Sequence, residues 1–160
     1  MLKSRRLFPD HLQRVLRVQL VDGDVVARLR VAEYLRAAGL EVQNAADAAS
    51  ALVQMQQAKP DVVVLDPAVL WSHALVARCR RDACLADVPL LLLSNEPKLS
   101  QAVQNLRARA GLAKSTDLDV LVAVVTCVAG CGALRSPHVR QGFGWAAAGS
   151  HGAEWALGAA

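Results

Sequence analysis

The sequence is poor in aromatic residues and has no apolar run long enough to cross a membrane. Tryptophan, tyrosine and phenylalanine make up 4% of its 160 residues, although hydrophobic residues of all kinds make up 54%. We therefore expect a core built from Ala, Val and Leu. The longest apolar runs, at 88–93 and 118–128, are well short of the roughly 20 residues that a membrane span needs. With 20% charged residues, the composition is that of a compact folded protein.

The cysteines show neither the spacing of a disulfide framework nor that of a common zinc site. They lie at Cys79, Cys84, Cys127 and Cys131. A zinc site can be drawn from Cys127, Cys131, His138 and His151, but its spacing fits no common template. We interpret the four cysteines instead as small buried or half-buried thiols.

The length and charge set further limits. A chain of 160 residues has room for one ordinary domain plus a tail. The net charge of +4 comes from scattered arginines and from short clusters at 3–6 and 78–81. No recognition helix, zinc finger or aromatic-interleaved basic patch accompanies these clusters, so we expect solvated helix faces rather than nucleic-acid binding. The Arg5-Arg6 pair is not followed by the apolar stretch that an export signal needs. We therefore expect the protein to lie in the reducing cytoplasm.

Short apolar runs alternate with segments of helical spacing along most of the chain. The runs predict strands at 17–21, 41–44, 62–65, 88–93 and 112–113. Between and after them, helices are predicted at 26–38, from 48 to the break at 59–61, at 72–82, 97–109 and 118–128. This alternation predicts an α/β fold, a doubly wound five-stranded parallel sheet with helices on both faces.

Three segments are expected: a basic leader at 1–16, the α/β domain at 17–129, and a Gly/Ala-rich tail at 130–160. The tail has no sustained period, so we expect it to be flexible. Trp145 and Trp155 leave an alternative open, in which they anchor the tail to a partner or to the domain itself.

The residues that close the predicted strands form a chemically sensible set, because ligands collect at the carboxyl edge of an open parallel sheet. They are Asp22, Gly23, Asp24, Asp66, Ser94 and Lys114. The carboxylate of Asp66 can attack phosphorus to give an acyl phosphate, provided that cations offset the negative charge. Asp22 and Asp66 with one backbone carbonyl would form an open Mg²⁺ site, Lys114 would pair with a phosphoryl oxygen, and Ser94 would donate a hydrogen bond to another. Each residue alone is ordinary turn chemistry; the combination is more specific.

With these residues assembled, the chain resembles the receiver domain of two-component response regulators over residues 17–128. The motifs that carry the resemblance are Val-Asp-Gly-Asp at 21–24, Val-Val-Leu-Asp at 63–66, Ala-Asp-Val-Pro at 86–89 with Ser94, and Lys114. The resemblance implies a flavodoxin-like strand order of 2-1-3-4-5, Asp66 as phosphoacceptor, Ser94 as switch hydroxyl and Lys114 as phosphate-pairing lysine. It adds the backbone carbonyl of Ala68 as a ligand for Mg²⁺. The implied partners are a sensor histidine kinase or phosphotransfer protein and an unidentified downstream protein.

Several positions depart from the family pattern. Gly23 stands where the second acid is expected, and Asp24 could replace it only if the loop were re-aimed. Gly111 replaces an aromatic residue on the last strand, and Leu70, Ala74 and Ser115 replace the usual proline, glycine and proline. We expect the peptide bond before Ser115 to be trans.

Two functional interpretations follow. The first is a stand-alone signalling module that is phosphorylated on Asp66. The second is a pseudo-receiver that binds partners without phosphorylation, because its acidic pocket is incomplete at Gly23. A hydrolase or nucleotide-binding enzyme is disfavoured, because the chain lacks a Gly-rich phosphate loop and a Ser-His-Asp set. We expect no enzyme activity beyond self-phosphorylation from a phosphodonor and slow autodephosphorylation.

Overall fold

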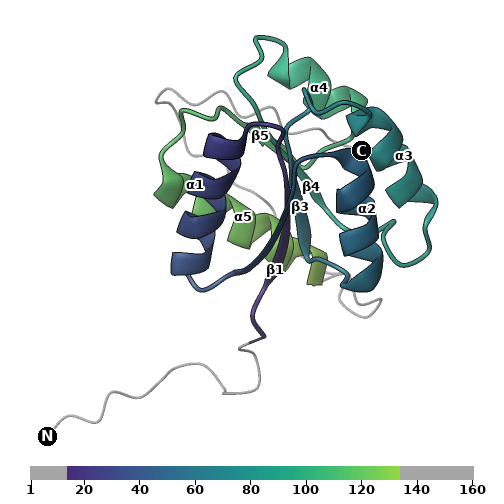
Figure 1. The fold of residues 1–160 in the computed structure, drawn as a ribbon, viewed down its shortest axis with the longest axis horizontal. Helices are drawn as coiled ribbons and strands as arrows, with labels where there is room; N and C mark the ends of the chain where they lie inside the picture. Colours follow the sequence, from purple (N-terminus) through teal and green to yellow (C-terminus); the bar gives the residue numbers. More distant parts are fainter. Residues whose placement is uncertain (1–13, 134–160) are drawn as a thin grey trace, which may run out of the picture.

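The computed structural model describes residues 14–133. Within them, five strands form one parallel sheet in the order β2-β1-β3-β4-β5 (Figure 1). The strands are β1 (Arg17–Val21), β2 (Glu41–Ala45), β3 (Val62–Leu65), β4 (Leu90–Leu93) and β5 (Ala110–Leu112). The predicted doubly wound fold and its strand order are confirmed.

A helix follows each strand, and the helices cover both faces of the sheet. They are α1 (Val25–Ala37), α2 (Ala48–Gln57), α3 (Ser72–Arg81), α4 (Leu99–Asn105) and α5 (Leu118–Ala133). Helices α1 and α5 pack on one face, and α2, α3 and α4 pack on the other. No helix in this part of the chain is long and apolar enough to cross a membrane.

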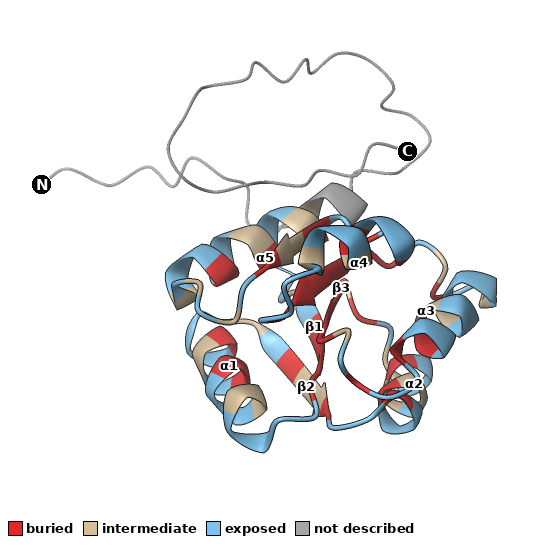
Figure 2. Cartoon of the chain, turned by 90° about the horizontal axis from the view of Figure 1, so that it is seen from above, coloured by how far each residue is buried: buried red, intermediate tan, exposed pale blue. Residues whose placement is uncertain are grey.

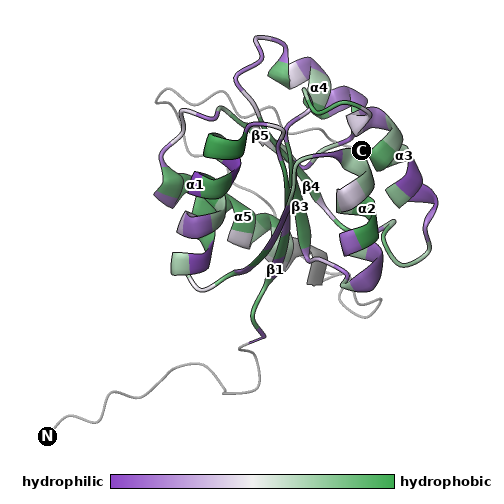
Figure 3. Ribbon diagram, in the orientation of Figure 1, coloured by the Kyte–Doolittle hydropathy of each residue, from purple (hydrophilic) through white to green (hydrophobic). Residues whose placement is uncertain are grey.

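The central strands are buried on both faces, as their unbroken apolar sequences require (Figures 2 and 3). In β3, Val62 and Val64 pack with α1 and α5, whereas Val63 and Leu65 pack with the other three helices. The same alternation runs along β4, because successive side chains of a strand point to opposite faces. This burial fixes the register of the strands and hence the position of the residues that follow them.

Local hydrogen bonds and backbone conformation set the ends of the first two helices. The carboxylate of Asp24 caps α1 by accepting from two backbone N–H groups, and Asp47 caps α2 through the N–H of Ser50. Gly39 follows α1 with a φ of 89°, the left-handed conformation that favours glycine after a helix.

The boundaries at the other end of the sheet differ from those predicted. Strand β4 begins at Leu90 rather than at 88, because Val88 closes a turn onto Leu85 and Pro89 has no N–H to donate. Helix α4 is shorter than predicted, and Arg107, with a φ of 51°, lies in the left-handed conformation just after it. Strand β5 starts earlier than predicted, at Ala110, and α5 continues beyond the predicted end at 128 to Ala133.

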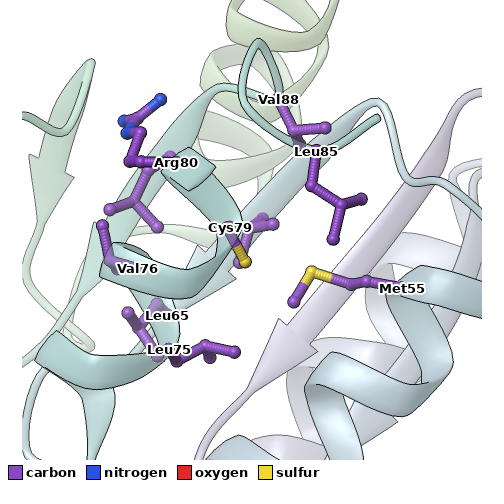
Figure 4. Close-up of a pocket in the computed structure, with 10 residues that line it drawn as sticks. Met55, Leu65, Leu75, Val76, Cys79, Arg80, Leu85 and Val88 are labelled. Carbon is purple, nitrogen blue, oxygen red and sulfur yellow. The ribbon is translucent and has the colours of Figure 1, made fainter. Parts of the chain in front are cut away.

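A small cavity of about 20 Å³ lies between α2, α3 and the sheet, where the side chains of Met55 and Cys79 face each other (Figure 4). It is about the size of one water molecule. Burial raises the pKa of the Cys79 thiol, so Cys79 behaves as a packing residue. The interpretation of buried thiols is wrong for Cys84 and Cys127, which are exposed because they lie in a turn and on an outward position of α5.

The remaining expectations fall partly outside this range. His138, His151, Trp145 and Trp155 lie outside the described residues, as do most of the predicted leader and tail. Every peptide bond in the described range is trans, including the one before Ser115.

Candidate functional site

The carboxyl edge of the sheet gathers buried polar side chains. Asp22 follows β1, Asp66 follows β3 and Ser94 follows β4, and their exposed fractions are 2%, 8% and 2%. These three account for most of the five buried polar or charged residues in the described range. Because buried polar groups are unfavourable unless they are paired, such a concentration marks this edge as the candidate site.

A lysine joins the two aspartates. The Nζ atom of Lys114, which follows β5, lies 2.8 Å from Oδ2 of Asp22 and 2.6 Å from Oδ2 of Asp66. Burial alone would lower the pKa of Lys114, but its hydrogen bonds to the two carboxylates outweigh burial and raise that pKa. The ammonium group is therefore held charged between two acids that come from adjacent strands.

Backbone groups fix the other oxygen of each aspartate. Oδ1 of Asp22 accepts from the N–H of Asp24 at 2.8 Å, and Oδ1 of Asp66 accepts from the N–H of Ala68 at 2.9 Å. Arg28 of α1 also reaches this edge and donates to the backbone carbonyl of Asp22 at 2.6 Å. Each Oδ1 thus faces its own loop, and each Oδ2 faces the shared lysine.

The loops that follow β4 and β5 are joined by Asn95, the residue after Ser94. Oδ1 of Asn95 accepts from the backbone N–H of Lys114 at 3.0 Å, and the hydroxyl of Ser94 accepts from the N–H of Glu96 at 3.2 Å. The hydroxyl hydrogen of Ser94 can still be donated to an incoming oxygen. Sequence reasoning missed Asn95 and Arg28, because neither contact follows from a local pattern.

The position where a second acid was expected, Gly23, is open around its Cα atom. A side chain at Gly23 would meet only the carbonyl oxygen of Ala46, at 3.8 Å from its Cβ atom. Asp24 does not fill the gap: its Oδ1 accepts from the N–H groups of Val26 and Ala27. The hydrogen bond from Ala27 is the main reason why the pKa of Asp24 lies below its usual value.

The donor set is nevertheless compatible with a cation. The ammonium of Lys114 already occupies a position between two carboxylates, and Mg²⁺ is often bound by one or two carboxylates plus waters. Within residues 14–133, no group of three or more His, Cys, Asp or Glu side chains is arranged to hold a metal. Asp22 and Asp66 are the two carboxylates that the Lys114 ammonium already joins at this edge.

Two further features at this edge were not predicted. Trp71, at the end of the loop that follows Asp66, has a φ of 66°, which is rare for a residue with a large side chain. On β5, a Cβ atom at Gly111 would lie 2.6 Å from Cγ2 of Val103 and 3.2 Å from Cγ of Leu99. Helix α4 therefore packs directly on the backbone of β5, in the space that an aromatic side chain would need.

Comparison with known proteins gives relatives over the same region. No model of a known protein family matches the chain. The transcriptional regulatory protein PrrA of Mycobacterium leprae is 36% identical over 113 residues, covering 68% of this chain and 48% of PrrA. The DNA-binding dual master transcriptional regulator RpaA of Synechocystis is 28% identical over 113 residues, covering 68% of this chain and 47% of RpaA. The chain therefore spans about half the length of these curated relatives.

The fold matches solved structures over a whole domain. The chemotaxis protein CheY4 of Vibrio cholerae superimposes with a TM-score of 0.66 and 28% identity, covering 72% of this chain and 99% of CheY4. The described residues form a receiver domain. The resemblance noted from the sequence is thus confirmed, and this receiver domain is a signalling module of the response-regulator type.

Proposed function

We propose that the receiver domain accepts a phosphoryl group on Asp66 and passes the signal on through protein contacts. The donor we propose is a sensor histidine kinase or a phosphotransfer protein, and the recipient of the signal is a downstream protein of unknown identity. The observation that carries the proposal is the ion-paired lysine: Lys114 is 2.6 Å from Asp66, where an acyl phosphate would form.

The chemistry follows from the hydrogen bonds. Ala68 holds Oδ1 of Asp66, which leaves Oδ2 as the oxygen that faces the ammonium of Lys114. In the proposed step, an oxygen of Asp66 forms a bond to phosphorus while the bond from phosphorus to the donor breaks and its electron pair leaves with the donor. Lys114 offsets the negative charge of the group that arrives, and Ser94 can donate its hydroxyl hydrogen to a phosphoryl oxygen.

We further propose that Mg²⁺ binds this site weakly. Asp22, Asp66 and the backbone carbonyl of Ala68 would hold it, and a bound Mg²⁺ would offset charge on the carboxylate and the phosphoryl group. The weakness follows from Gly23, which offers no side-chain ligand, and from Asp24, whose carboxylate caps α1. Asp24 could contribute only by giving up these capping bonds.

The test is phosphorylation by a small donor. The protein is incubated with acetyl phosphate and Mg²⁺, and intact mass spectrometry is used to look for one added phosphoryl group that is stable in acid and labile in base. We expect this adduct on the wild-type chain and on Asp87→Asn, which removes an exposed carboxylate, but not on Asp66→Asn. An unmodified wild-type chain, or an adduct that persists in Asp66→Asn, would contradict the proposal, and the first outcome would leave the pseudo-receiver interpretation.

A further inference from the structure

The loop after the acceptor exposes two large apolar side chains. Leu70 is 74% exposed and Trp71 is 70% exposed, although both follow the buried Asp66 within five residues. Exposed large apolar side chains that lie next to each other are a feature of interaction sites. We refer to Leu70 and Trp71 together as the apolar knuckle.

The backbone of the knuckle is both strained and tightly held. Trp71 occupies the left-handed conformation, in which a bulky side chain is unfavourable. The N–H of Ser72 donates to the carbonyl of Val69, and the hydroxyl of Ser72, which is buried, donates to the carbonyl of Pro67. The N–H of Val69 in turn donates to the carbonyl of Asp66. A strained residue that its surroundings hold in place points to a functional role rather than to a loose loop.

The knuckle is also tied to the acceptor itself. Ala68 donates to Oδ1 of Asp66 from the same loop. On the neighbouring strand β1, the segment that follows Asp22 opens into the first turn of α1, where Val25 and Val26 are 55% and 77% exposed. Exposed apolar side chains therefore belong to the segments that leave two adjacent strands at the acceptor edge.

We propose that the apolar knuckle is a docking contact for the phosphohistidine-bearing protein that delivers the phosphoryl group to Asp66. This inference rests on the proposed function, and it deepens it by assigning residues that select the donor. Asp66 is only 8% exposed, so a protein donor must bring its imidazole into a recess and rest its own surface on the surrounding rim. Leu70 and Trp71 offer an uncharged rim, which fits an apolar surface beside the phosphohistidine. A small donor such as acetyl phosphate needs no such contact.

The test compares donors that differ in size. Sensor-kinase catalytic cores from the organism that encodes the chain are autophosphorylated with radiolabelled ATP and mixed with wild-type protein, Trp71→Gly or Leu70→Ser. Acetyl phosphate serves as the small donor. Val53→Ser is the matched control, because Val53 is 53% exposed but belongs to α2 rather than to the loop that follows Asp66.

We expect the ratio of transfer rate from the kinase to transfer rate from acetyl phosphate to fall by roughly tenfold or more in Trp71→Gly, as the loss of a central aromatic contact implies. Leu70→Ser should lower the same ratio, and Val53→Ser should leave it at the wild-type value. Glycine accepts the left-handed conformation, so Trp71→Gly is expected to fold.

Other outcomes overturn the inference. Equal ratios in wild type and Trp71→Gly would show that the knuckle does not contact the donor. A wild-type chain that takes the group from acetyl phosphate but from no kinase would show that the donor class is wrong. A change of oligomeric state in Trp71→Gly on gel filtration would show that a second copy covers the knuckle. Failure of the wild type with acetyl phosphate as well would instead reject the proposed function.

Discussion

Gly23 shows how one residue can set the strength of a site without altering the fold around it. The neighbouring acids, Asp22 and Asp66, share the ammonium of Lys114, and the space at Gly23 is open. We predict that Gly23→Asp raises the affinity for Mg²⁺ by roughly tenfold or more, because affinity rises with the number of charged oxygen ligands. The measurement is a Mg²⁺ titration followed by calorimetry.

Gln57→Asp provides the control for this prediction, because it adds the same charge at an exposed position at the end of α2. Without Mg²⁺, Gly23→Asp should be less stable than the wild type, since a third carboxylate then repels the other two. Added Mg²⁺ should restore the stability, because a ligand that binds only the folded state stabilises it. An unchanged affinity for Mg²⁺ would mean that this position does not face the cation.

Trp71 gives a second prediction at the residue scale, one concerning stability. The left-handed conformation costs a residue with a Cβ atom about 1 kcal/mol relative to glycine, and the exposed indole loses little packing when it is removed. We therefore expect Trp71→Gly to be about 1 kcal/mol more stable than Trp71→Ala in urea denaturation. If the alanine variant is as stable as the glycine variant, Trp71 is not strained.

At the scale of elements, α4 packs closely against β5 because position 111 has no side chain. A Cβ atom at Gly111 would lie 2.6 Å from a methyl group of Val103. We predict that Gly111→Ala destabilises the domain by about 1–3 kcal/mol, the usual cost of overpacking a core. Gly130→Ala on α5 is the matched comparison: apart from its chain neighbours and the backbone of its own helix, no atom lies within 4 Å of the added Cβ. Alanine also favours a helix, so we expect a gain of about 0.5–1 kcal/mol.

Thermal or urea unfolding of Gly111→Ala and Gly130→Ala measures whether the two substitutions change stability in opposite directions. Opposite signs support the packing argument, whereas a neutral Gly111→Ala would show that α4 moves away from β5 at little cost.

The elements that the sequence alone predicts well are those with strong local signals. Strands β1 and β3 have the predicted bounds, because an apolar run and a turn signal define each of them. Asp47 and Gly39 mark helix ends through short-range hydrogen bonds and backbone conformation. The start of β5 depends instead on partners across the sheet, such as the carbonyl of Leu90, which accepts from the N–H of Arg109, and no local pattern reveals this bond.

In the candidate site, too, some features could be predicted from the sequence and others depend on the folded structure. Asp22, Asp66 and Lys114 could be identified because parallel strands bring their carboxyl ends to one edge. Their pairing with one ammonium group, the capping role of Asp24 and the conformation of Trp71 depend on distances and angles that only the folded chain defines.

Across the whole molecule, the acceptor edge lies where the two halves of the core meet. One half packs α1 and α5 against the sheet, and the other packs α2, α3 and α4. Asp22 and Asp66 close the two adjacent strands β1 and β3, and Lys114 and Asn95 bring in the ends of β5 and β4. The site therefore exists only when these strands are in register, so its charge state is linked to the stability of the whole domain.

Lys114 makes this linkage measurable. Its pKa is raised in the folded state above the ordinary value of 10.5, because the hydrogen bonds to Asp22 and Asp66 outweigh burial. A raised pKa means that the stabilisation is fully present below pH 10.5 and is lost as the pH rises through the folded-state pKa. We predict that Lys114→Met is less stable than the wild type at neutral pH, because two largely buried carboxylates lose their shared cation.

The difference in free energy of unfolding between wild type and Lys114→Met should then become smaller above pH 10.5, because Lys114 of the wild type also loses its charge. Urea denaturation of both proteins from pH 7 to pH 11.5 measures it. Other groups that titrate in alkali, such as Tyr34, are common to both chains and cancel in the difference. Lys59→Met, which removes an exposed lysine, should show no such pH dependence relative to the wild type. A gap that stays constant to the highest pH would mean that Lys114 stabilises the domain through packing of its aliphatic chain rather than through its charge.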